Sequence, residues 1–145
     1  MKHTARICGL VLGVSLFASW AHAVSEDPLQ QFKLASLAYQ NGRFDSAEQE
    51  YEGFVKNFSN HRLAAQARLA LAEIKFAQKK YPEAISQMEQ AAALIPNNAQ
   101  MWAYVGFVQL QAGDVANAQK NFTHALSLDP ANQIAHAGLA KIRQP

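Results

Sequence analysis

The chain has 145 residues, with 13 basic and 11 acidic side chains, a formal net charge of +2 and one cysteine, Cys8. This length corresponds to one modest domain. A nearly neutral domain has no broad basic surface, so we expect neither nucleic acid nor an anionic membrane as a partner. A lone cysteine excludes an intrachain disulfide and a cysteine-based zinc site.

Residues 1–23 have the three zones of a secretory signal peptide. Lys2 and Arg6 form a positive start, an apolar stretch follows from Ile7 to Trp20, and Ala-His-Ala at 21–23 gives a small-x-small cleavage pattern. The apolar stretch is shorter than the roughly 18 to 20 residues that span a bilayer. We therefore predict cleavage after Ala23, a periplasmic or secreted mature chain and no stable membrane anchor. Cleavage removes two basic residues and no acidic one, which leaves the mature chain neutral.

Three similar segments follow along the chain, each centred on an alanine. The segments are "GRFDSAEQEYEGF" around Ala47, "KKYPEAISQMEQA" around Ala84 and "AGDVANAQKNFTHA" around Ala118. The first two alanines are 37 residues apart and the last two are 34 apart. Windows such as "LAAQARLALAEIKFAQ" have helical and not alternating periodicity. The sequence thus predicts an array of helical repeats.

The third segment resembles the tetratricopeptide repeat (TPR) family most closely. It matches the family pattern at Trp102, Val105-Gly106, Gly113, Ala118, Phe122, Ala125 and Pro130. It departs at Gln109, where the family has Tyr. The second repeat has Lys79 for the turn glycine, and the first lacks the closing proline and carries three extra residues near 60–62. The resemblance covers nearly all of residues 28–130.

This resemblance implies an all-α fold, an α-solenoid of three TPR helix hairpins plus a C-terminal capping helix. After a short lead at 24–27, the repeats would span 28–61, 65–98 and 99–132, and the capping helix and tail would span 133–145. Small side chains let paired helices approach closely, and larger ones fill the remaining space. We expect Leu34, Leu71, Tyr51 and Phe122 to fill it. Gly42 and Gly113 can adopt the left-handed conformation that ends a helix.

In this family the first helix of each repeat lines a concave groove that binds a peptide or helix of a partner. The resemblance assigns the following positions to that groove: Phe32, Ser36, Tyr39, Gln40, Leu69, Glu73, Phe76, Ala103, Phe107, Leu110, Gln111 and Lys141, with Ala137 beside them. This largely apolar set suits an amphipathic helix or an extended apolar segment.

Two features refine this expectation. An apolar stripe at helical spacing is usually core, so Leu69, Leu110 and Phe76 are equally consistent with core positions. Phe32, Tyr39 and Phe107 are the favoured contacts. The carboxylate-clamp subtype of the family needs Lys, Arg and Asn in slots that here hold Phe32, Ser36 and Gln100, so capture of an acidic C-terminal tail is not expected.

Nothing in the sequence indicates catalysis, a cofactor or a metal. No nucleophile stands beside a base, and no two of His61, His124 and His136 have the helical spacing of a metal pair. We interpret the acidic run Glu48–Glu52 as a solvated helix face. The expected protein is not an enzyme.

Our leading hypothesis is a periplasmic adaptor that binds a helix or apolar peptide of another cell-envelope protein. The passage "FVKNFSNHRLAAQARLALAE" is similar to passages in bacterial envelope TPR proteins. That similarity implies roles of the cell-envelope assembly, pilus or cytochrome c maturation type. The alternative is a structural subunit that self-associates through the solenoid ends. For this the apolar residues Ile134, Leu139 and Ile142 of the cap are the candidates.

Overall fold

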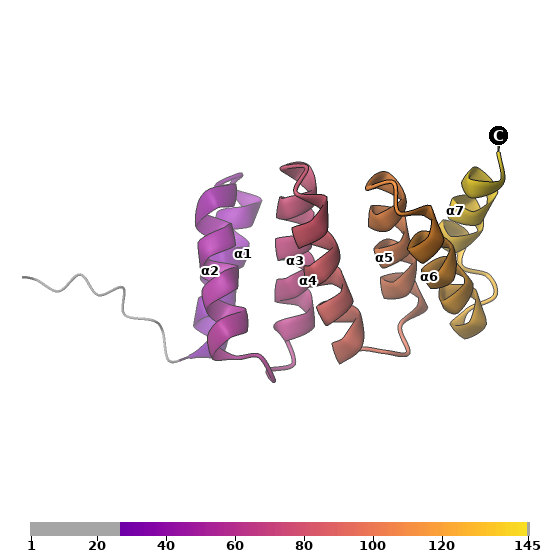
Figure 1. The fold of residues 1–145 in the computed structure, drawn as a ribbon. Helices are drawn as coiled ribbons and strands as arrows, with labels where there is room; N and C mark the ends of the chain where they lie inside the picture. Colours follow the sequence, from indigo (N-terminus) through magenta and orange to yellow (C-terminus); the bar gives the residue numbers. More distant parts are fainter. Residues whose placement is uncertain (1–26, 145) are drawn as a thin grey trace, which may run out of the picture.

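The computed structural model describes residues 27–144, which form seven α-helices and no strand. The predicted signal peptide lies outside these residues. The helices are α1 (Pro28–Gln40), α2 (Phe44–Asn57), α3 (Ala64–Ala77), α4 (Tyr81–Leu94), α5 (Ala99–Gln111), α6 (Val115–Leu128) and α7 (Gln133–Arg143). They pair as α1–α2, α3–α4 and α5–α6, and the pairs follow one another in a single row that ends in α7 (Figure 1). The all-α solenoid is therefore confirmed.

Helix boundaries follow from local sequence. Asp27 caps α1 by accepting a hydrogen bond from the backbone N–H of Leu29 at 2.9 Å, and Pro28 occupies the first helical turn. Asn98 and Asn132 cap α5 and α7 in the same way, each at 3.0 Å. Such caps satisfy backbone donors that the helix itself leaves unpaired.

The turn inside each pair uses one left-handed residue at the same place. Gly42 and Gly113 have φ of 71° and 84°, as expected, and Lys79 adopts φ of 60° where the second repeat has no glycine. A non-glycine residue in this region carries a steric cost. The turn geometry is therefore imposed by the packing of the pair, even where the sequence does not favour it.

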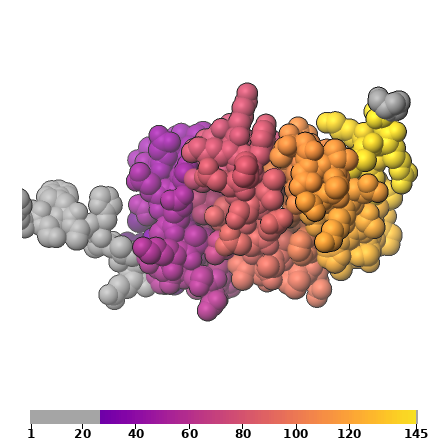
Figure 2. Space-filling model, in the orientation of Figure 1, coloured from indigo at the N-terminus to yellow at the C-terminus, as the bar shows by residue number. Residues whose placement is uncertain are grey.

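Three successive clusters of buried side chains form the core, and each lies between one helix pair and the helix that follows it. Ala47, Ala84 and Ala118 are fully buried, as the repeat spacing predicts, and Leu71, Phe122 and Tyr51 fill space beside them. Each cluster joins neighbouring helices only, so each repeat occupies its own band along the molecule (Figure 2).

Leu34 contradicts its predicted role. Its equivalents in the next two repeats, Leu71 and Val105, are fully buried, but the side chain of Leu34 is 48% exposed. In the later repeats this position packs on the preceding repeat. Among the described residues no helix precedes α1, so the same face of α1 is uncovered.

The cap also differs from one expectation. Ile134, Leu139 and Ile142 are partly buried and pack on the last core cluster, so only part of their apolar surface faces outward for the predicted stacking. Exposed positions of α7 are small or polar, among them His136, Ala140 and Arg143. Within residues 27–144 no helix combines the length and the apolarity needed to cross a bilayer.

Candidate partner-binding groove

The first helices of the repeats place equivalent residues in rows along the solenoid. Glu73 on α3, Phe107 on α5 and Lys141 on α7 are successively 34 residues apart, so they share one register position. Phe76 and Leu110 share a second position on α3 and α5. The two rows define a surface that runs across α3, α5 and α7, which we call the groove.

The first hollow of the groove lies between α3 and α5 and has a volume of about 210 Å³. Leu69, Glu73 and Phe76 line one side, and Tyr104 and Phe107 line the other, with Met88 and Val108 at its base. The rings of Phe76 and Phe107 are 6.0 Å apart between centroids and tilted by 43°. Among residues 27–144, Glu73 is the only charged side chain that lines this hollow.

The second hollow, of about 240 Å³, lies between α5 and α7. It is lined by Phe107, Leu110 and Gln111 on α5 and by Ile134, Ala137, Gly138 and Lys141 on α7. Of the residues that the structure describes, Lys141 is the only charged one that lines this second hollow. Phe107, with 40% of its surface exposed, belongs to both hollows and separates them.

The four predicted positions on α1 lie beyond this groove. Phe32 packs edge-on against Tyr51 and Phe54, with ring centroids 5.7 and 5.5 Å apart, so it belongs mainly to the first core cluster. The hydroxyl of Ser36 lies 3.1 Å from that of Tyr51. Gln40 is exposed and lines neither hollow.

Tyr39 connects α1 to the groove. Its hydroxyl donates a hydrogen bond to Oε2 of Glu73 at 3.0 Å. Burial, and then this carboxylate acceptor, raise the pKa of Tyr39. The phenol therefore stays protonated and keeps one carboxylate oxygen of Glu73 in place, while Oε1 has no partner within the described residues.

Ala103, predicted as a groove position on α5, also lies outside the groove. It is fully buried in the third core cluster, because an alanine at this point allows close packing of α5. Sequence reasoning missed its exposed neighbour Tyr104, and also Ile134 as a lining residue. Tyr104 stands one residue further along α5, where the repeat before it has Ala70, so the family pattern gave no signal for it.

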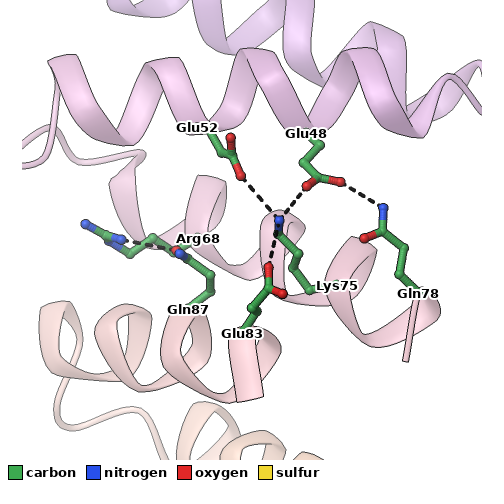
Figure 3. A network of polar contacts seen from close by, with 7 residues as sticks. All are labelled: Glu48, Glu52, Arg68, Lys75, Gln78, Glu83 and Gln87. Atoms are coloured by element: carbon green, nitrogen blue, oxygen red, sulfur yellow. Dashed lines mark hydrogen bonds and ion pairs between the residues drawn. The ribbon is translucent and has the colours of Figure 1, made fainter. Parts of the chain in front are cut away.

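Outside the groove, a buried charge joins the first two repeats. Lys75 on α3 has a side chain only 10% exposed, and its Nζ contacts Glu48 at 2.5 Å, Glu83 at 3.0 Å and Glu52 at 3.3 Å (Figure 3). Glu48 also accepts a hydrogen bond from Gln78 at 2.8 Å. The acidic run at 48–52 is thus not merely a solvated face, which corrects our interpretation.

The ionisation of this cluster follows from its contacts. The hydrogen bond to Glu48, together with those to Glu83 and Glu52, raises the pKa of Lys75 despite its burial. Burial opposes the ionisation of Glu48, but hydrogen bonds from Lys75 and Gln78 outweigh it and hold the pKa of Glu48 below its usual range. Lys75 and Glu48 are therefore both charged near neutrality.

Gln109, where the third repeat departs from the family Tyr, holds the corresponding position one repeat later. It is buried, donates to Glu89 on α4 at 3.2 Å and accepts from Asn121 on α6 at 2.7 Å. Lys75 on α3 thus connects α2 with α4, and Gln109 on α5 connects α4 with α6. No group of three or more His, Cys, Asp or Glu side chains in residues 27–144 could hold a metal ion.

Comparison with known families agrees with this architecture. Models described as tetratricopeptide repeat match residues 32–99 and 99–132. The chain belongs to the tetratricopeptide repeat family, a family of protein-interaction modules.

The three individual proteins described next share between 22% and 31% sequence identity with this chain. The Hsp70-Hsp90 organizing protein of Triticum aestivum is 31% identical over 110 residues, which cover 75% of this chain and 18% of that protein. The second TPR domain of human RPAP3, solved with an HSP70 peptide, has a TM-score of 0.70 at 22% identity and covers 82% of this chain and all of that one. The Yersinia enterocolitica chaperone SycD, solved with a peptide of the translocator YopD, has a TM-score of 0.69 at 22% identity and covers 83% and 96% of the two chains. The chain spans about a fifth of the length of the first relatives, 18% and 20%.

Proposed function

We propose that the protein is an adaptor that binds a segment of another protein in the groove across α3, α5 and α7. The observation that carries the proposal is Phe107, a large apolar side chain that stays 40% exposed between two apolar hollows. Exposed aromatic side chains beside concave apolar surface are typical anchors of protein recognition. Peptide complexes of RPAP3 and SycD, which share the fold, support this reading.

We further propose that the partner is a cell-envelope protein and that the adaptor works in the periplasm. This rests on the signal-peptide pattern of residues 1–23 and on the similarity of the α2–α3 passage to envelope TPR proteins. Its test is fractionation of cells that make the full chain, with mass analysis of the mature N-terminus. A chain that begins at Val24 in the periplasmic fraction would support the proposal, and an intact cytoplasmic chain would refute it.

The groove itself is tested by site-specific crosslinking in intact cells. A photo-reactive benzophenone side chain placed at position 107 should crosslink a partner, and the same group at exposed Gln119 on α6 should not. Addition of Leu110→Glu should abolish the crosslink at 107, because a charge would stand in the second hollow. Equal crosslinking from both positions would contradict groove binding.

A second candidate function is self-association, and one observation favours it. Leu34 and Leu37 on α1 are 48% and 49% exposed, although the equivalent residues of the next repeat, Leu71 and Ile74, are buried. Because the exposed side chains of α7 at the other end of the row are small or polar, we propose that two copies bury this face head to head. Such contact closes a dimer and does not build a filament.

A further inference from the structure

We propose that the groove selects an extended segment carrying a basic side chain at one end, two apolar side chains in the middle and an acidic side chain at the other end. This inference rests on the proposed groove function and adds the chemistry of the partner. It comes from the order of side chains along the row Glu73, Phe107 and Lys141.

The row has opposite charges at its two ends. Within the described part of the chain, one charged side chain lines each hollow, Glu73 the first and Lys141 the second. Lys141 is exposed, and Glu73 keeps Oε1 available because Tyr39 bonds Oε2. A bound segment would therefore meet a carboxylate over α3 and an ammonium group over α7.

The spacing of the row defines the spacing in the ligand. The helices α5 and α7 pack directly, which places their axes about 8 to 10 Å apart, and α3 meets α5 through the rings of Phe76 and Phe107, so we take Glu73 and Lys141 to be separated by about 20 Å. An extended strand rises about 3.3 Å per residue and points alternate side chains to one face, so seven residues span this distance. Residues one, three, five and seven of the segment would then face the groove.

The two hollows receive the middle pair. Each lies between neighbouring helices, and their volumes, about 210 and 240 Å³, are those of side-chain pockets and not of a helix-wide channel. Residues three and five would fall on either side of Phe107, where the walls are Phe76 and Tyr104, then Leu110 and Ile134. The ligand sequence that fits the groove is therefore basic-x-apolar-x-apolar-x-acidic, read in either chain direction.

Three labelled peptides test this order by fluorescence anisotropy with the mature chain. Each contains two leucines at positions three and five, and the outer residues are Lys and Glu in the mixed peptide, Glu and Glu in the acidic one, and Lys and Lys in the basic one. The mixed peptide should bind about 3- to 10-fold more tightly at low salt, and the preference should shrink as salt is added.

Charge variants of the protein give the decisive comparison. Glu73→Lys should prefer the acidic peptide and Lys141→Glu the basic one. The double variant E73K/K141E should recover the mixed peptide, because that peptide can bind in the opposite direction. Lys120→Glu on the exposed face of α6 makes the same charge change as Lys141→Glu, and it should leave all three affinities unchanged.

The outcomes separate the two proposals. One outcome is that the peptides bind, that Phe107→Ala weakens their binding, and that the three peptides have equal affinities in every charge variant. In that case the proposed order of charges is wrong, but the groove proposal stands. Tighter binding by a helical peptide with seven-residue spacing would overturn the extended geometry. If no peptide binds, or Phe107→Ala changes nothing, the groove proposal itself fails.

Discussion

The ring of Phe122 lies directly against the backbone of Gly138, so close that a β-carbon on Gly138 would stand 2.2 Å from Cζ of the ring. The Cδ1–Cε1 edge of the same ring meets Gly106, where a β-carbon would be 2.9 Å away. Phe122 on α6 is fully buried and packs against both α5 and α7. Glycine at both places is what lets the capping helix approach the last repeat.

Gly138→Ala should therefore destabilise the protein although alanine is the better helix former. The change gains up to about 1 kcal/mol of helix propensity, but overpacking against a fixed ring costs about 1 to 3 kcal/mol. We expect a lower Tm by circular dichroism, with Ala140→Ser on the exposed side of α7 as the control. A Tm above that of the wild type would show that Phe122 can move aside.

Phe32 and Phe107 should respond differently to truncation, although both were predicted as groove contacts. Phe32→Ala removes a ring packed on Tyr51 and Phe54, so it should cost about 2 kcal/mol of unfolding free energy. Phe107→Ala should cost less than about 1 kcal/mol, because that ring is 40% exposed. Urea denaturation of both variants measures the difference, and equal losses would place Phe107 in the core.

The repeat pattern was sufficient to predict the solenoid because small residues at fixed intervals report close helix packing, as at Ala84 and Ala118. It could not predict which side of a helix stays uncovered at the end of the row. Leu34 has the same residue type and register as Leu71, and it differs only in having no described helix before it. Burial of such a position depends on its neighbour and not on its own sequence.

The groove was predictable only in part for a related reason. Family positions led to Glu73, Phe76, Phe107, Leu110 and Lys141, which line the hollows. Tyr104 was missed because the family pattern marks no side chain there. The Lys75 cluster was missed because its members, Lys75 included, come from three helices, and spacing within one acidic run says nothing about a lysine 27 residues away from Glu48.

The Lys75 cluster predicts a specific loss of stability in acid. The pKa of Glu48 is lower in the folded protein than its ordinary value of 4.5, so its contribution is present above that value and is lost as pH falls through the folded pKa. The pKa of Lys75 is raised, so Lys75 stays charged in acid, and its own deprotonation costs stability only as pH rises above its ordinary 10.5; in acid it loses its carboxylate partners. Glu48→Gln should flatten the decline of Tm below about pH 4.5, relative to wild type.

The matched control for this cluster is Glu50→Gln, an acid of the same helix that no described contact ties to Lys75. It should keep the wild-type pH profile. Lys75→Met should lower stability near neutrality by about 1 to 3 kcal/mol, because it leaves Glu48 without its main partner. If Glu48→Gln and Glu50→Gln have identical profiles, the cluster does not govern acid stability.

The uncovered face of α1 gives the last prediction, which concerns association. If two copies meet head to head, a protein of residues 24–145 should sediment as a dimer at high micromolar concentration, and Leu34→Glu with Leu37→Glu should make it a monomer. Both side chains are about half exposed, so the charges should leave the monomer fold and its helical circular dichroism intact. Ala140→Glu, on the exposed face of α7 at the opposite end, should not change the mass. A wild-type monomer at these concentrations would exclude the head-to-head contact, and a dimer lost only with Ala140→Glu would place it at α7.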